Sequence, residues 1–354
     1  MAFDVAVVGG GPAGTATALA LRAHAPRLTV AIYESSRYDE PRIGETLPPP
    51  ARRLLEQHGV WAAFAAQRHK VVHGTASAWG EATARDQHFL FAAAGTGWHL
   101  DRAAFDAMLA YEAERRGATL FLGTRVQSAE DIPARFVVDA TGTAAIARSR
   151  GARVVAADRL VSFARTFDDA GGDPRTFVES FADGWWYTAA LPGGKRIAAC
   201  MTDHDIGRHL GLHDDAGWEQ AFASMPLTSS LAPRIEKAGP VVVRACDSRR
   251  LDSPCADDWL AVGDAASRFD PLSSQGIMKA LRGGAFAAYA VGDFLTRGDD
   301  SGLRRYRSFI AAEFEGYLAT RAEYYAEEGR WAEREFWRRR GPYESNATPP
   351  MGRP

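Results

Sequence analysis

The sequence is poor in cysteine and lysine and has no long hydrophobic run. Its 354 residues include 3 cysteines, none in a Cys-x-x-Cys pair, which argues against a disulfide framework and favours a reduced, cytoplasmic compartment. The most apolar long stretch, residues 284–295, is too short to cross a bilayer, and no signal peptide precedes the first strand-like run. A net charge of −2 predicts no affinity for nucleic acid or membrane surfaces. We therefore expect a soluble protein without nucleic-acid or membrane partners.

Motifs for hydrolysis and metal chemistry are also missing. The sequence shows no Ser-His-Asp arrangement, no His-Glu-x-x-His motif and no cluster with metal-ligand spacing, so we expect no metal site.

A glycine-rich motif lies at the start of the chain. Residues 4–8 predict a buried strand, Gly9, Gly11 and Gly14 satisfy Gly-x-Gly-x-x-Gly, and residues 13–24 predict a helix. Residues 28–34 predict a second buried strand that ends in Glu34, twenty residues after Gly14. The glycines permit a tight turn and close approach of a pyrophosphate to the helix N-terminus, while the acid can accept hydrogen bonds from a ribose. The unit predicts dinucleotide binding.

The remainder of the chain decides between NAD and FAD. The proline-rich segment 41–50 interrupts the expected second half of a nicotinamide-binding domain, and there is no second Gly-x-Gly-x-x-Gly. Two later segments, "RFVVDATG" at 135–142 and "DDWLAVGDAASRFDPLSSQGIMKAL" at 257–281, resemble those of FAD-dependent aromatic hydroxylases. That resemblance implies FAD as the cofactor, with Asp264 near the ribityl chain and a helix starting near Gly276 directed at the flavin. The predicted cofactor contacts are Gly9, Gly11, Pro12, Ala13, Gly14, Glu34, Arg42, Arg102, Asp139, Thr141, Gly142, Gly263, Asp264, Pro271, Ser274, Gln275, Gly276 and Ile277.

The interleaving of these segments predicts an α/β fold of two units. We expect a Rossmann-like FAD-binding domain from residues 1–70, 99–153 and 256–300. Short apolar and aromatic runs in 71–98 and 154–255 predict a mostly antiparallel substrate sheet. Residues 301–340 predict C-terminal helices, and 341–354 have the composition of a disordered tail.

Three stretches resemble flavin-dependent tryptophan halogenases. "RIGETLPP" (42–49) and "DPLSSQG" (270–276) are similar to their flavin-binding segments, and "GWWYTAALP" (184–192) lies where they carry Trp-x-Trp-x-Ile-Pro. In that alignment Tyr187 and Ala189 occupy the two tryptophan positions. Halogenases also need an active-site lysine, for which Lys70 is the only well-placed candidate; its surroundings match poorly, and the pattern favours an exposed surface lysine.

A wider resemblance covers most of the chain. It rests on "SAWG" (77–80), "GWHLDRAAFDAML" (97–109), "DPLSSQGIMKALRGG" (270–284) and "RAEYYAEEGRWAEREFWRRR" (321–340). These segments are similar to the flavoprotein maturases of cysteine tryptophylquinone amino-acid oxidases, which hydroxylate a tryptophan in a partner protein. The resemblance implies a monooxygenase that acts on an aromatic substrate through a flavin C4a-hydroperoxide.

The residues around this reaction follow from the motifs. Acid/base candidates are Glu45 and Asp270 in flavin-adjacent segments, together with His69 and His73. Substrate-lining candidates are Trp185, Trp186 and Tyr187, with Trp186 expected on the opposite strand face from the other two. The electron donor is expected to be NAD(P)H or a separate flavin reductase. Three alternatives stay open: a flavin-dependent halogenase, a reductase of the geranylgeranyl-reductase type and a non-catalytic FAD-binding accessory protein.

Overall fold

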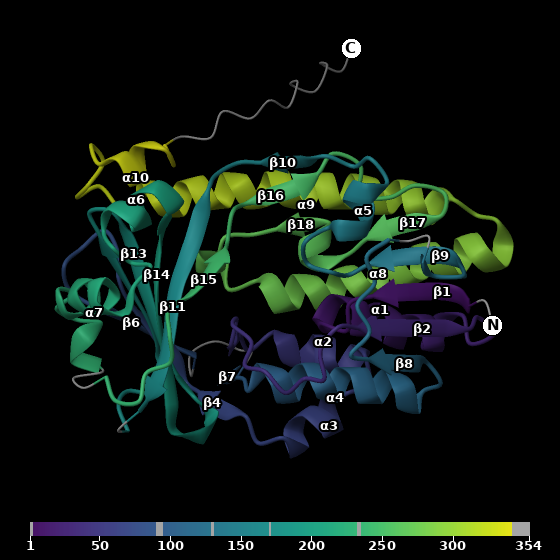
Figure 1. The fold of residues 1–354 in the computed structure, drawn as a ribbon, viewed down its shortest axis with the longest axis horizontal. Helices are drawn as coiled ribbons and strands as arrows, with labels where there is room; N and C mark the ends of the chain where they lie inside the picture. Colours follow the sequence, from purple (N-terminus) through teal and green to yellow (C-terminus); the bar gives the residue numbers. More distant parts are fainter. Residues whose placement is uncertain (1–2, 90–94, 129–130, 170, 232–234, 342–354) are drawn as a thin grey trace, which may run out of the picture.

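The computed structural model describes residues 3–89, 95–128, 131–169, 171–231 and 235–341, so most of the predicted tail lies outside the described residues. Figure 1 shows two units side by side, a parallel sheet with helices and a larger twisted sheet, with one long helix running across both. The predicted α/β architecture is confirmed.

The first unit is built on a five-stranded, wholly parallel sheet in the order β17-β9-β1-β2-β8. Its strands are β1 (Phe3–Val8), β2 (Val30–Glu34), β8 (Thr119–Leu122), β9 (Ala134–Asp139) and β17 (Trp259–Ala261). The helices of this unit include α1 (Pro12–His24), α4 (Arg102–Arg115), α5 (Ala145–Ser149) and α8 (Gly276–Arg297). The middle of each central strand is apolar and buried, at residues 5–8, 30–32 and 136–138, because helices cover both faces of the sheet. Small residues let α1 and α8 pack closely: a Cβ on Gly284 would lie 2.7 Å from the Cβ of Ala16.

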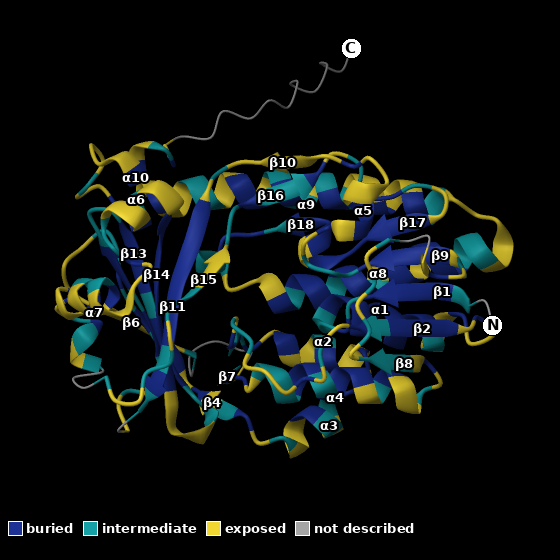
Figure 2. Ribbon diagram, viewed as in Figure 1, coloured by how far each residue is buried: buried dark blue, intermediate teal, exposed yellow. Residues whose placement is uncertain are grey.

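The second unit is a seven-stranded sheet in the order β15-β11-β14-β13-β12-β5-β6, antiparallel except for the β12–β5 pair. Its strands are β5 (Gly74–Ala78), β6 (Arg85–His88), β11 (Leu160–Asp168), β12 (Thr176–Phe181), β13 (Gly184–Leu191), β14 (Lys195–Asp203) and β15 (Val242–Ala245). The helices α6 (His204–His209) and α7 (Asp215–Ala223) belong to this unit. Figure 2 shows the strands of both sheets largely buried and the outer helical surfaces exposed.

Two small three-stranded sheets accompany the large ones. One contains β3 (Thr46–Leu47), β7 (Gly97–His99) and β4 (Lys70–Val72), next to the helices α2 (Ala51–Gln57) and α3 (Trp61–Ala66). The other contains β10 (Val154–Ala156), β16 (Arg249–Leu251) and β18 (Ser267–Arg268). Residues 154–156 and 249–251 lie within the range expected for the substrate sheet, yet they pair with each other in this separate sheet, where β16 also pairs with β18.

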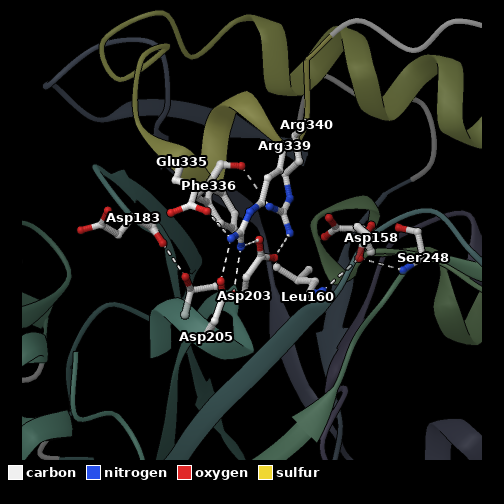
Figure 3. Close-up of polar contacts among 12 residues, drawn as sticks. Asp158, Leu160, Asp183, Asp203, Asp205, Ser248, Glu335, Phe336, Arg339 and Arg340 are labelled. Carbon is white, nitrogen blue, oxygen red and sulfur yellow. Dashed lines mark hydrogen bonds and ion pairs between the residues drawn. The ribbon is translucent and has the colours of Figure 1, made fainter. Parts of the chain in front are cut away.

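The C-terminal helices join the two units. Helix α9 (Ser301–Ala326) packs on α8, and the short α10 (Glu335–Arg338) covers the end of β14. Asp203, at the end of β14, accepts hydrogen bonds from Arg339 at 2.7 Å and from Arg340 at 2.6 Å (Figure 3). Asp203 and Arg340 are almost completely buried, so this ion pair fixes the last described turn of the chain against the sheet.

The aromatic stretch at 185–187 divides between the two faces of the large sheet. Trp186 packs against Trp218 and Phe222 of α7, whereas Trp185 lies in the cluster that contains Tyr325 and Phe336 from the C-terminal segment. None of the helices within the described ranges is both long and apolar enough to cross a membrane.

Candidate active site

The glycine motif forms a cradle at the N-terminus of α1. Gly9 has φ +111°, and a Cβ there would lie 2.3 Å from the carbonyl oxygen of Ala140; a Cβ on Gly14 would lie 2.0 Å from the Gly9 carbonyl oxygen. A Cβ on Gly11 would meet nothing within 4 Å. No side chain caps the start of α1, so its first N–H groups face this open space. An anion such as a pyrophosphate fits there.

Glu34 organises the loop beside this cradle. Its carboxylate accepts hydrogen bonds from the Gly10 N–H at 2.7 Å, from the Ser36 hydroxyl at 2.6 Å and from Arg42 at 2.9 Å. Burial alone would raise the pKa of Glu34, but these hydrogen bonds and the Arg42 charge hold it below its ordinary value. Its contact with a ribose remains a prediction.

Arg42 and Arg102 converge on one buried carboxylate, Asp106. Arg42 contacts it at 2.8 Å and Arg102 at 3.2 Å. Arg102 also donates to the carbonyl groups of Ile43 and Gly44, at 2.9 and 2.8 Å. Arg102 therefore fixes the segment that leads to Glu45, and direct contacts of the two arginines with FAD remain predictions.

The 139–142 motif needs a correction at its first residue. Asp139 is completely buried, and its oxygens accept hydrogen bonds from the Thr141 N–H and hydroxyl and from the Ala147 N–H. With its oxygens satisfied within the protein, the side chain supports the loop from behind rather than facing a cofactor. Gly142, with φ +73°, has open space where a Cβ would be.

The loop from Gly263 to α8 completes the predicted FAD contacts. The Asp264 side chain is 46 % exposed and lies 3.3 Å from the amine of Lys279, whose pKa is lowered by burial. A Cβ on Gly276, the first residue of α8, would meet nothing within 4 Å, and no side chain caps this helix. Pro271 begins a 3-10 turn, Ser274 has a left-handed φ of +50°, Gln275 is the N-cap and Ile277 is buried. Open space at Gly11, Gly142 and Gly276 is what a bound FAD requires, so these residues fit the cofactor.

Glu45 is a buried acid with a raised pKa. Its side chain is buried, and burial raises its pKa to about 7, although the charge of Arg102 opposes this shift. A carboxyl group with that pKa is partly protonated at neutral pH and can donate or accept a proton. Its negative charge in turn helps burial to raise the pKa of Tyr187.

A buried polar chain joins β3, the short strand that follows Glu45, to the large sheet. The hydroxyl groups of Thr46 and Tyr187 lie 2.9 Å apart, and those of Thr46 and Thr176 lie 3.4 Å apart. The Nε2 atom of His99 contacts the Thr176 hydroxyl at 2.8 Å, and its Nδ1 atom contacts the Ala190 carbonyl at 2.7 Å. Burial lowers the pKa of His99 to about 4, so the imidazole is neutral. Thr46, His99 and Thr176 are not among the residues predicted from the sequence; the signals for them were that Thr46 lies in the segment 42–49 and His99 in the segment 97–109, both of which resemble known flavoproteins.

Asp270 is held in a second network. Its carboxylate accepts a hydrogen bond from the Tyr325 hydroxyl at 2.8 Å and one from the Leu272 N–H at 2.9 Å, with Arg321 at 3.4 Å. The indole N–H of Trp185 donates to the same Tyr325 hydroxyl at 3.0 Å. Burial raises the pKa of Asp270, against the charge of Arg321. These contacts hold the Asp270 side chain in place, and its predicted acid/base role remains a prediction.

Three sequence candidates lie away from this arrangement. His73 is exposed between β4 and β5, and the structure does not bring it to Glu45 or Asp270. His69 is buried, with Nε2 2.8 Å from Gln67 Oε1, and packs against Phe64. Trp186 is 0 % exposed and faces α7, so its predicted contact with a substrate is wrong for this structure. Trp185, 1 % exposed, acts through Tyr325, and Tyr187 alone of the three keeps partial exposure.

These features fit an FAD-dependent oxidoreductase, the class that the comparisons with known proteins support. Residues 2–166 match the family model of an FAD binding domain, which confirms the predicted cofactor. In sequence the chain is 29 % identical over 362 residues, 96 % of each protein, to the FAD-dependent oxidoreductase LodB of Marinomonas mediterranea.

Two solved structures share the fold and 25 % of the sequence. The flavin-dependent halogenase CmlS has a TM-score of 0.80, with 98 % of this chain and 68 % of that one covered. The peptidyl tryptophan dihydroxylase QhpG, essential for tryptophylquinone cofactor biogenesis, has a TM-score of 0.76, with 96 % and 79 % covered. The expected resemblance to both hydroxylating and halogenating flavoproteins is therefore confirmed.

Proposed function

We propose that this protein is an FAD-dependent monooxygenase that hydroxylates an indole-type ring, the side chain of a tryptophan in a partner protein. The observation that carries the proposal is the similarity over nearly the whole chain to LodB and to the peptidyl tryptophan dihydroxylase QhpG. The departure of "GWWYTAALP" from the halogenase pattern, with tyrosine and alanine at the two tryptophan positions, supports it further.

In this proposal the residues of the chain hold a proton, order the neighbouring hydroxyl groups and bind the negatively charged parts of the cofactor. FAD, when reduced, supplies the activation of O₂. Glu45, protonated in part at neutral pH, holds a proton in a buried place, and Tyr187 beside it orders the neighbouring hydroxyl groups. The open N-termini of α1 and α8 hold negative charge on the cofactor's phosphates and ring. Burial of these groups excludes water from the site.

The reducing equivalents come, in this proposal, from NAD(P)H or a separate flavin reductase. In this proposal the protein works in a reducing, cytoplasmic compartment, as expected from its 3 cysteines without Cys-x-x-Cys spacing.

Halogenation is the second candidate, and Lys70 is the observation that favours it. Lys70 begins β4, pairs in register with His99 and is only partly exposed; its charge helps to lower the pKa of His99. Lys70 therefore lies next to the buried polar chain. This position suits an active-site lysine of a halogenase better than that of a fully exposed surface lysine would.

The experiment supplies FAD-loaded, chemically reduced enzyme with the unmodified precursor of a tryptophylquinone amino-acid oxidase, O₂, chloride and bromide. We expect peptide mass mapping to find oxygen added to a tryptophan. A halogenated product that is lost in Lys70→Ala but kept in the exposed control Lys195→Ala would replace the proposal by halogenation.

A further inference from the structure

A depression lined by arginines lies at α5. It has a volume of about 730 Å³ and is lined by Ala145, Arg148, Ser149, Ala152, Arg153, Val154 and Arg249. This volume lies within the range of roughly 300–1,000 Å³ that small-molecule sites occupy. Three of the lining side chains are arginines and none is acidic. Most of its lining residues come from α5 and from the segment that leads into the exposed edge strand β10; both elements are near the top of Figure 2.

The arginines here are short of negative partners. Arg249 is only 17 % exposed, and its nearest carboxylate, Asp247, is 3.8 Å away and pairs more closely with Arg268, at 2.9 Å. Burial, first, and the charges of Arg268 and Arg148 lower the pKa of Arg249. Arg148 has no carboxylate partner within the described ranges, whereas Arg153 pairs with Asp252. The uncompensated positive charge favours an anion with more than one charge.

The depression also touches the predicted cofactor loop. The carbonyl oxygen of Gly142 accepts hydrogen bonds from Arg249 at 3.4 Å and from Arg268 at 3.2 Å. Arg249 therefore contributes to the depression and at the same time holds the loop predicted to pass beside FAD. A ligand bound to these arginines would lie next to the cofactor and outside its cradle.

We propose that this depression binds the phosphate groups of NADPH, the reductant of the flavin. The proposal rests on the proposed function, because only a flavin enzyme with turnover consumes a reductant. Arg148 and Arg249 would hold the phosphates, with Arg153 at the rim. In the reaction the dihydronicotinamide gives a hydride, two electrons and one proton, to oxidised flavin, which leaves NADP⁺ and the anionic reduced flavin.

The test measures NADPH and NADP⁺ binding to the FAD-loaded protein in Arg148→Gln and Arg150→Gln. Arg150 is the matched control, because it is the same residue type two positions along, pairs with Asp258 and does not line the depression. Anaerobic stopped-flow absorbance gives the concentration dependence of flavin reduction, and calorimetry gives the Kd of NADP⁺. We expect Arg148→Gln to raise the NADPH concentration that gives half-maximal flavin reduction, and the Kd of NADP⁺, by about tenfold or more, as for loss of one charged hydrogen bond. Arg150→Gln should leave both values within about twofold of the wild type.

Three results would overturn the proposal. If the wild-type protein neither bound NADP⁺ nor were reduced by NADPH, NADPH would be excluded as the ligand. Equal weakening in both variants would mean a general charge effect. Looser FAD in Arg148→Gln would assign the depression to the FAD itself. Hydroxylation is assayed separately with dithionite-reduced enzyme. A failure to hydroxylate would therefore not affect the NADPH binding result, and a failure to bind NADPH would not affect the hydroxylation result.

Discussion

At the scale of the residue, the glycines of the cradle differ in what they do. We expect Gly11→Ala to fold like the wild type and to bind FAD more weakly, since the added Cβ meets no protein atom but enters the space predicted for the pyrophosphate. Gly14→Ala should instead prevent folding, because its Cβ would lie 2.0 Å from a backbone oxygen. Circular dichroism and FAD titration separate the two effects. A Gly11→Ala protein with normal FAD affinity would contradict the predicted path of the cofactor.

Glu45 links the pH dependence of stability to the site. Its folded-state pKa is about 7, above the ordinary value of 4.5, so the folded protein keeps a proton that the unfolded chain releases as the pH rises from 4.5 to 7. Glu45 therefore contributes stability below pH 4.5 that is lost as the pH rises through about 7, on the order of 3 kcal/mol over this range. Urea unfolding at pH 5 and at pH 8 measures this fall in the free energy of unfolding. In Glu45→Gln the part of the fall that is due to Glu45 should be absent. An unchanged difference between the two pH values would show that Glu45 has an ordinary pKa.

The same substitution bears on the reaction. If Glu45 provides a proton, product formation by reduced enzyme falls as the pH rises through about 7, and Glu45→Gln is slow at every pH. A wild-type pH profile in Glu45→Gln would exclude this residue from the proton transfer.

The sequence could predict residues whose task is set by their neighbours along the chain. The cradle glycines, the acid at the end of β2 and the loop before α8 follow from local motifs. It could not predict that Arg42 and Arg102 meet at Asp106, since Arg42 and Asp106 are 64 positions apart, or that Asp139 turns inward. Whether a strand residue faces a substrate or a packed helix, as with Trp186, depends on the unit that covers that face.

At the scale of the element, α9 connects the flavin loop to β13 through Tyr325. Tyr325→Phe removes the hydroxyl that donates to Asp270 and accepts from Trp185, leaving two buried polar groups without this partner. We expect it to lower the free energy of unfolding by about 1–3 kcal/mol. The neighbouring Tyr324→Phe is the control, because that side chain is 55 % exposed and should change stability by less than about 0.5 kcal/mol. Equal effects of the two substitutions would contradict a structural role for this hydroxyl.

The docking of α10 depends on Asp203. Asp203→Ala would leave Arg340 buried without its carboxylate, with an expected loss of about 3–5 kcal/mol in denaturant unfolding. Asp205, which pairs with Arg339 in the same region of Figure 3, has a side chain 49 % exposed. Asp205→Ala should therefore cost no more than about 1 kcal/mol. If both variants were equally stable, α10 would not be anchored by the buried pair.

At the scale of the whole molecule, the interleaving of the two units could be foreseen because the FAD motifs recur at separated positions. The sheet formed by β10, β16 and β18 could not, because its strands have only two or three residues and come from distant parts of the chain. Such short strands carry no periodicity that a sequence can reveal. The bridging of both units by α9 likewise depends on long-range contacts rather than on the helix's own pattern.

The most direct measurement of the central claim follows the source of the new atom in the product. Reduced, FAD-loaded enzyme is mixed with the oxidase precursor and ¹⁸O₂ in buffer that contains chloride and bromide, and the modified tryptophan is identified by mass spectrometry. Our account predicts ¹⁸O in the indole ring and no halogen. A halogenated ring, or flavin that reoxidises without changing the tryptophan, would contradict it.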